Sequence, residues 1–290
     1  MQHPEIDSEG LAEIQAEIRY ILSEVTRLAE ESGLPLLASY GTLLGAVRDQ
    51  ALIPWDVDGD LWVPTRHYDA LCAYLREHLP PTMQLLDPET DPDYEYLFGR
   101  VAPRGVDHKR IHVDLFPLSG APKSRVGQRL YMVSVRLLFQ AFLVKRMKLD
   151  EMLHYSSGKR LFARLSQGVL RLVPERLIVA SYKRFVAFFD RPRASTMTNP
   201  CGSYGEREFW DARWFSRTTG GRLSGIKVSV PVGYDALLTY IYGDYMRPID
   251  ESSQRAELAH LTRYFVKPLK EQGWRPSHLD IPPAEQSRAN

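Results

Sequence analysis

The sequence predicts an α+β fold, and two observations support that prediction. In some segments apolar residues recur every three or four positions, which is typical of amphipathic helices. In others they alternate with polar residues, as in strands that bury one face. With 290 residues, 44% of them hydrophobic, the chain is long enough for one large domain or two smaller ones.

The two patterns divide the chain into a mixed first part, an almost wholly helical middle and an irregular last part. The predicted elements, in order, are helix 11–29, strand 36–39, a glycine-bounded turn and short helix 41–48, a strand from residue 56, helix 65–78, strands 83–86, 94–101 and 110–116, helices within 123–189, strand 228–232 and helix 234–242.

Charge follows the same division. Residues 1–122 hold 9 Lys and Arg against 21 Asp and Glu, a net charge of −12, whereas residues 123–193 hold 16 against 4, a net charge of +12. The formal total of +1 hides this asymmetry. An acidic first third suggests a metal site, and a cationic middle suggests an anionic partner. We predict a catalytic core in 1–122, a large basic amphipathic helical insertion in 123–193, a part that completes the catalytic domain in 194–275, and a flexible tail in 276–290.

Several classes of protein are disfavoured. Cys72 and Cys201 lie too far apart in sequence for a zinc motif, and two cysteines do not suggest a disulfide framework. The amino terminus does not resemble a signal peptide, and the most apolar window, 130–144, is too short and polar to span a membrane. No nucleic-acid-binding motif is present, so nucleic acid is not expected as a partner. We expect a cytoplasmic protein, with a peripheral position on the inner face of the membrane as the alternative.

A row of aspartates is the main chemical feature. Asp56, Asp58 and Asp60 alternate with Val57, Gly59 and Leu61, so a strand here would place all three carboxylates on one face. Their mutual repulsion would favour a bound divalent cation, and Mg²⁺ (or Mn²⁺) suits closely spaced carboxylates. The bland alternative is a solvated edge strand whose charges deter aggregation.

Further candidate residues lie on either side of the row. Asp114, in another alternating segment, would add a fourth carboxylate, act as a metal ligand and serve as a general base. Gly41 and Thr42 suit a phosphate-facing turn, because glycine permits close backbone approach. Arg48 and Arg100 are candidates for binding donor phosphate, although either residue would equally cap a helix or pair with an aspartate.

Two blocks, Tyr40–Arg48 and Ile53–Asp60, together resemble the signature of the LicD/fukutin family, as do the segments 113–117 and 242–248. The resemblance implies a nucleotidyltransferase-like mixed sheet with flanking helices. It implies metal-dependent transfer of phosphocholine or a polyol phosphate from a CDP-linked donor to a glycan or lipid-linked glycan acceptor. By the same resemblance, Asp58, Asp60 and Asp114 would be catalytic, all four aspartates would bind metal, and Gly41 and Thr42 would face phosphate.

Other interpretations remain open. Asp58-Gly59-Asp60 also fits the D-x-D of a nucleotide-sugar glycosyltransferase, and an inactive membrane-associated scaffold of the same fold is a third reading. In the basic middle, apolar residues such as Leu130, Val133 and Leu137 recur at helical spacing among arginines and lysines. That pattern predicts either helices lying on an anionic membrane surface or a helical subdomain whose apolar faces meet each other.

Overall fold

The structure is a computed structural model that describes residues 6–146, 168 and 172–277. It confirms the α+β class. The chain forms two compact units: the first comprises residues 1–85, 100–116 and 213–290, and the second comprises residues 86–99 and 117–212. The helical insertion expected in 123–193 falls within the second unit, which also includes the segment 86–99. No helix in the described part of the chain is long and apolar enough to cross a membrane.

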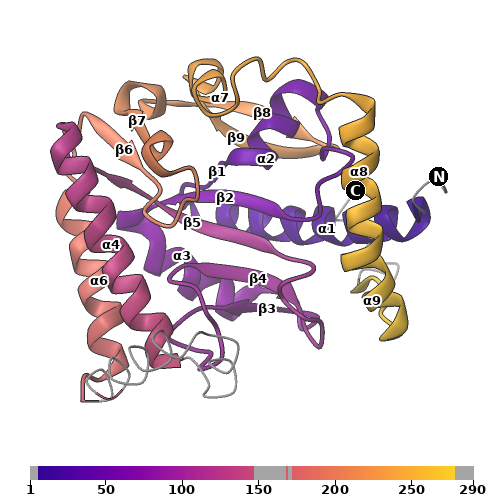
Figure 1. Ribbon diagram of the computed structural model, residues 1–290, viewed down its shortest axis with the longest axis horizontal. Helices are drawn as coiled ribbons and strands as arrows, with labels where there is room; N and C mark the ends of the chain where they lie inside the picture. Colours follow the sequence, from indigo (N-terminus) through magenta and orange to yellow (C-terminus); the bar gives the residue numbers. More distant parts are fainter. Residues whose placement is uncertain (1–5, 147–167, 169–171, 278–290) are drawn as a thin grey trace, which may run out of the picture. The chain divides into compact units, whose positions relative to one another are not determined.

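A long amphipathic helix organises the first unit. Helix α1 (Ser8–Ser32) begins where the Asp7 carboxylate accepts a hydrogen bond from the Gly10 backbone N–H, and it ends at Gly33 with a φ of 68°. Its apolar stripe is almost fully buried. Together with α3 (Thr65–His78), α1 covers one face of the sheet (Figure 1). Both helices were predicted from the sequence, the first from its apolar spacing.

The central sheet has the strand order β1-β2-β5-β4-β3. The strands are β1 (Leu37–Ala38), β2 (Gly59–Pro64), β3 (Met83–Leu86), β4 (Gly99–Pro103) and β5 (Val113–Gly120). Strands β1 and β2 are antiparallel, with Leu37 opposite Trp62 and Ala38 opposite Leu61. Because β1 ends at Ala38, the residues that follow it lie beside the start of β2.

The predicted strand 94–101 is wrong over its first half, since β4 begins only at Gly99. The alternating aromatic residues before it reflect side-chain packing. Tyr94 is fully buried, and its ring centroid lies 5.4 Å from that of Tyr96, which lies 5.0 Å from Phe98. The period-two spacing of these clustered aromatic residues thus imitates the pattern of a strand in the sequence.

Elements near the carboxyl end complete the first unit. They are the hairpin β8 (Thr218–Leu223) and β9 (Ile226–Pro231), helix α7 (Tyr234–Tyr242), helix α8 (Glu251–Leu261), the π-helical turn η5 (Thr262–Val266) and helix α9 (Lys267–Glu271). Helix α7 matches its prediction, whereas α8, η5 and α9 were not predicted. The hydrophilic composition of α8, which buries only Leu261, explains why no apolar period marked it.

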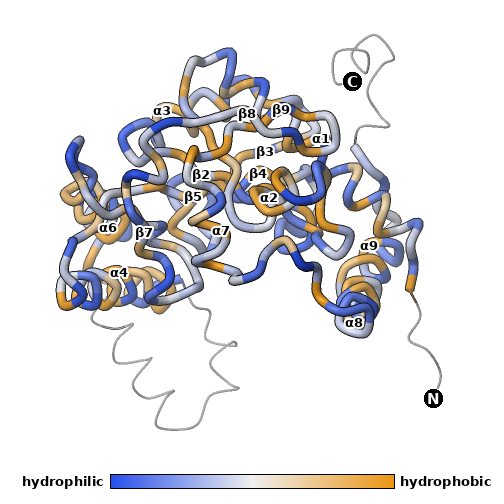
Figure 2. Tube along the Cα trace, turned by 90° about the horizontal axis from the view of Figure 1, so that it is seen from above, coloured by the Kyte–Doolittle hydropathy of each residue, from blue (hydrophilic) through white to orange (hydrophobic). Residues whose placement is uncertain are grey.

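Helices α4 (Arg125–Arg146) and α6 (Glu175–Phe189) and a small strand pair make up much of the described part of the second unit. The two helices pack on each other, and the last residues of β5 pair with β6 (Thr196–Thr198), which pairs with β7 (Phe209–Asp211). Aromatic and aliphatic side chains from these elements form its core, including Tyr131, Phe142, Ile178, Val179, Tyr182 and Phe209. Hydrophobic and hydrophilic positions alternate along α4 (Figure 2).

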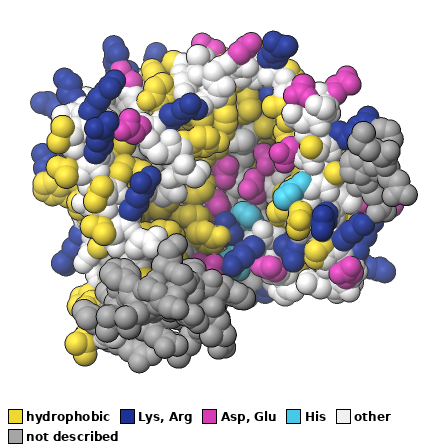
Figure 3. Space-filling view, viewed as in Figure 1, with side chains coloured by type: hydrophobic (Ala, Val, Ile, Leu, Met, Phe, Trp, Pro, Cys, Tyr) yellow, Lys and Arg dark blue, Asp and Glu magenta, His cyan; other side chains and the backbone are white. Residues whose placement is uncertain are grey.

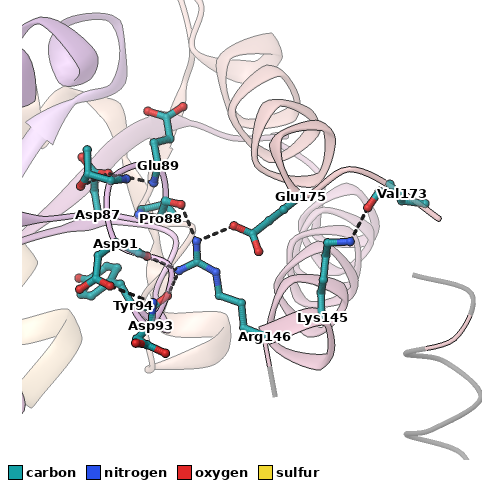
Figure 4. Close-up of polar contacts among 11 residues, drawn as sticks. Asp87, Pro88, Glu89, Asp91, Asp93, Tyr94, Lys145, Arg146, Val173 and Glu175 are labelled. Atoms are coloured by element: carbon teal, nitrogen blue, oxygen red, sulfur yellow. Dashed lines mark hydrogen bonds and ion pairs between the residues drawn. The ribbon is translucent and has the colours of Figure 1, made fainter. Parts of the chain in front are cut away.

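Two basic residues of α4 have structural tasks inside this unit (Figure 4). The Arg146 guanidinium donates to the backbone oxygens of Pro88, Asp91 and Tyr94 and lies 2.5 Å from a Glu175 carboxylate oxygen. Lys145 donates to the Val173 carbonyl at 2.6 Å. These two cations bind α4 to its neighbours, so they are not among the charges available to an external partner. Lys148, another basic residue of this stretch, lies outside the described residues.

Candidate active site

The chain leaving β1 anchors the backbone of Asp60. The Ser39 N–H donates to the Asp60 carbonyl at 3.0 Å, and the Thr42 hydroxyl accepts from the Asp60 N–H at 2.8 Å. Between these contacts the chain enters helix α2 (Tyr40–Leu44) through Tyr40, whose φ of 39° lies in the left-handed region. Thr42 is almost completely buried. Its hydroxyl thus has a positioning task, and the phosphate contact expected of it stays a prediction.

Gly41 makes room for a carboxylate. A Cβ added at this position would lie 2.5 Å from Oδ2 of Asp56, well inside van der Waals contact. Any larger residue here would force the Asp56 carboxylate to shift, because it lies directly against the backbone of α2. The first glycine of the sequence motif therefore positions the aspartate row.

The three aspartates do not share a strand, and this part of the sequence prediction is wrong. Strand β2 begins at Gly59, so Asp60 lies on it while Asp56 and Asp58 belong to the preceding loop. The Asp56 N–H donates to the Ile53 carbonyl in a turn. Aspartate is a poor strand former that bonds readily to nearby backbone, which favours the loop here.

A glutamine of α1 holds that loop. The Gln15 side-chain amide nitrogen lies 3.0 Å from the carbonyl oxygen of Ile53, 3.2 Å from that of Pro54 and 3.1 Å from that of Asp56. Three carbonyls thus converge on one amide group, so the course of the loop before Asp58 depends on α1. Gln15 was not predicted as a site residue. In the sequence it is simply a polar residue directly after the apolar Ile14.

Packing explains why a glycine, which weakens a strand, stands between Asp58 and Asp60 at position 59. A Cβ there would lie 3.0 Å from a methyl of Val113 and 3.1 Å from one of Leu22, so a larger residue would fit only if these side chains gave way. The Gly59 N–H also donates to the His112 carbonyl at 3.1 Å. The close approach brings the start of β2 beside the segment that carries Asp114.

The four carboxylates are close enough to perturb one another. Burial raises the pKa of Asp60 well above its ordinary value, and the negative charges of Asp58, Asp114 and Asp56 raise it further. Burial also raises the pKa of Asp56, followed by the charge of Asp58 and a hydrogen bond to it. Acidic side chains gather beside histidine on the face seen in Figure 3. The Asp58 side chain is 42% exposed, whereas that of Asp114 is 8% exposed.

Asp114 is neutralised by a buried arginine. The Nε of Arg100 lies 2.5 Å from Oδ1 of Asp114, and Nη2 donates to Oδ2 at 2.9 Å. Burial raises the pKa of Asp114 to about 6, against the lowering effect of the hydrogen bonds and charge of Arg100. Arg100 is only 4% exposed, and its Nη1 donates to the His108 carbonyl. The phosphate contact predicted for Arg100 is therefore replaced, in this arrangement, by bidentate pairing with Asp114.

His112 lies between two carboxylates. Its Nε2 is 3.9 Å from an oxygen of Asp58 and 3.9 Å from one of Asp114. Burial, followed by the nearby positive charge of Arg100, lowers the pKa of His112 well below its usual range, so the ring is neutral near pH 7. The sequence contained a signal for this residue, since His112 and Asp114 are two positions apart in an alternating segment.

Arg48, the other arginine predicted to bind phosphate, is also paired. It lies in the π-helical turn η1 (Gly45–Asp49), where its Nε and Nη2 donate to the two oxygens of Asp49 at 2.9 and 2.8 Å. Its Nη1 donates to the Tyr245 carbonyl at 3.2 Å. Helix α2, η1 and the segment after α7 are thereby joined.

A divalent cation fits the site only with help from its substrate. In the described parts of the chain, no three His, Cys, Asp or Glu side chains stand ready to bind one ion together. The concentrated negative charge around Asp60 nevertheless suits a cation. Mg²⁺ is commonly held by one or two carboxylates completed by substrate phosphates and water. The metal prediction thus requires two of Asp56, Asp58 and Asp60 together with donor phosphate.

A groove of about 970 Å³ lies elsewhere in the first unit. Its lining comes from the end of α1, β1, η1 and the β8–β9 hairpin, and includes Leu61. Since Leu61 follows Asp60 directly on β2, the two side chains point to opposite faces. The groove therefore lies on the other side of β2 from the Asp60 carboxylate, and the carboxylate cluster remains the candidate site for chemistry.

Comparison with known proteins identifies related sequences. The family described as LicD/FKTN/FKRP, nucleotidyltransferase domain, matches residues 33–136, a range that contains every site residue predicted above. Mannosyltransferase regulator 14 of Saccharomyces cerevisiae is 33% identical over 67 residues, which are 23% of this chain and 7% of that protein. The chain thus matches only a small part of this relative's length.

Proposed function

We propose that the chain is a transferase of the LicD/FKTN/FKRP type, because residues 33–136 match that nucleotidyltransferase-domain family. The donor would be CDP-activated, the transferred group phosphocholine or a polyol phosphate, and the acceptor a hydroxyl of a cell-surface glycan or glycolipid. The observation that carries the proposal is that Asp56, Asp58 and Asp114, from a loop and a second strand, lie close enough to Asp60 to raise its pKa, with His112 3.9 Å from both Asp58 and Asp114.

The proposed reaction is an in-line displacement. A bond forms between the acceptor oxygen and the phosphorus of the transferred group, and the bond from that phosphorus to the CMP oxygen breaks. The acceptor proton passes to a carboxylate. Asp114 was the first candidate for this base, but it is 5% exposed and both its oxygens are bonded to Arg100. Asp58 is better exposed and takes that role in the proposal.

Asp58 and Asp60 would hold Mg²⁺ or Mn²⁺, with Asp56 beside them. A bound divalent cation would supply charge neutralisation at the transferring phosphate. Both carboxylate oxygens of Asp114 are bonded to Arg100, so Asp114 would contribute only a fixed negative charge near Asp60. Gly41 and Thr42 would shape the loop on which the donor phosphates rest.

The test measures donor binding and turnover together. CDP-choline, CDP-glycerol, CDP-ribitol and UDP-sugars are each added with Mg²⁺, and stabilisation is followed by thermal shift and CMP release by phosphorus NMR. Asp58→Asn and Asp60→Asn should abolish CMP release while leaving the fold intact. Glu77→Gln, an exposed change on α3, is the matched control and should retain activity. Stabilisation by UDP-sugars alone, or full turnover in either aspartate variant, would overturn the proposal.

A regulatory role without transfer is the second candidate, and the name of the yeast relative favours it. A regulator would be expected to keep the fold, but it would not need the four aspartates for metal binding or proton transfer. Donor-dependent stabilisation in the absence of any CMP release, with every acceptor offered, would favour this reading over catalysis.

A further inference from the structure

Helix α4 has two apolar faces, and among the residues that the structure describes one of them is packed into a core while the other stays exposed. Tyr131, Met132 and Val135 are buried in the core of the second unit, against α6. A second set remains exposed: Val126 at 69%, Leu130 at 63%, Val133 at 51% and Leu137 at 65%. The sequence hypothesis that the apolar faces of these helices simply meet each other does not account for this second set.

The exposed residues form one continuous stripe. Their spacings of four, three and four residues place them within about 60° of one another around a helix that turns by 3.6 residues. Exposed large apolar side chains that recur in this way are unusual on a soluble surface and mark an interaction site. Hydrophobic side chains interspersed with Lys and Arg are visible over α4, at the left of the view in Figure 3.

Arginines line one edge of the stripe. Arg125, Arg129 and Arg136 are exposed and fall on the same side of the apolar row. Arg129 pairs with Glu206 at 3.0 Å, but both side chains are at least 70% exposed. An exposed ion pair of this kind contributes little to stability, so another anion can readily replace Glu206 beside Arg129. The surrounding segment 123–193 carries a net charge of +12.

We propose that this face of α4 lies on an anionic membrane surface. Val126, Leu130, Val133 and Leu137 would enter the boundary between headgroups and acyl chains, and the three arginines would lie at the lipid phosphates. A helix with a narrow apolar stripe, a basic flank and too many charges to span the bilayer has the properties of an interfacial helix. The charge identifies the partner, because a neutral or cationic surface would leave the arginines without counter-ions.

This inference goes beyond the proposed transferase activity and does not depend on it. It uses only residues of the second unit, none of which belongs to the carboxylate site. Membrane binding can therefore fail while donor turnover persists, and the reverse can also occur.

The experiment is vesicle co-sedimentation of the full chain with phosphatidylcholine alone and with added phosphatidylglycerol. Binding should require phosphatidylglycerol and weaken as salt rises. Leu130→Asp with Leu137→Asp should reduce the bound fraction at least tenfold. Arg125→Gln with Arg136→Gln should reduce the binding constant about fivefold for each arginine. The matched control, Val232→Asp with Ile249→Asp, changes apolar residues of the first unit that are 42% and 43% exposed and should bind normally.

All the substituted side chains are exposed, so circular dichroism and the melting temperature should match those of the unaltered protein. Absence of phosphatidylglycerol-dependent binding would overturn the proposal, as would normal binding by the Leu130 and Leu137 variant. A dimer that this variant converts to a monomer, with no vesicle binding, would instead assign the stripe to a second copy of the chain.

Discussion

The buried pair of Arg100 and Asp114 predicts a specific dependence of stability on pH. A carboxyl whose pKa is higher in the folded than in the unfolded protein binds its proton more tightly when folded. The free energy of unfolding therefore falls as the pH rises from the unfolded pKa through the folded one. For Asp114 these values are 3.8 and about 6. The complete loss corresponds to about 3 kcal/mol, of which about 2 kcal/mol falls between pH 4.5 and pH 7.5.

Asp114→Asn isolates this contribution. The substitution places an uncharged side chain of similar shape beside Arg100 at every pH, so the variant resembles the protein with Asp114 protonated and does not titrate at this position. The stability of the original protein relative to the variant should then decline by about 2 kcal/mol from pH 4.5 to pH 7.5. His112, whose lowered pKa gives the opposite slope below about pH 6.5, contributes to both proteins and largely cancels.

Urea unfolding in the presence of EDTA, at several pH values in this range, measures the difference between the two proteins. EDTA keeps trace divalent cations from obscuring the effect of the carboxylates. A difference that stays flat, or that grows as the pH rises, would contradict a raised pKa for Asp114. It would mean that Asp114 is held ionised by Arg100 and is not dominated by burial.

Two further predictions concern the loop that carries the aspartates. Gly41→Ala should lower turnover at least tenfold with little change in melting temperature, because the new Cβ would lie 2.5 Å from Asp56 Oδ2; Gly220→Ala in β8, where nothing lies within 4 Å, should be silent in the same CMP-release assay. Gln15→Leu removes a donor shared by three carbonyls, each bond worth about 1 kcal/mol. It should lower kcat and increase amide hydrogen exchange over 53–58, and unchanged exchange would show that the loop holds itself.

Much of the fold followed from local patterns. Helices α1, α3 and α7 appeared in the sequence because each buries one stripe of apolar residues at helical spacing. Strand limits were less accurate. The aromatic residues Tyr94–Phe98 alternate because they pack in a cluster, and alternation in sequence does not distinguish that arrangement from a strand.

Residue type, spacing and family resemblance were enough to single out all four aspartates and Gly41 as candidates for the site. Their surroundings became visible only in the folded chain. Asp56 and Asp58 lie in a loop, and it is Gln15 of α1 and the bare backbone at Gly41 that position this loop. Arg100 and Arg48, which sequence reasoning assigned to phosphate, are engaged by Asp114 and Asp49. The role of a charged side chain depends on which opposite charge the fold places beside it. Spacing patterns in the sequence do not reveal that neighbour, whether it is Asp114 beside Arg100 or Asp49 beside Arg48.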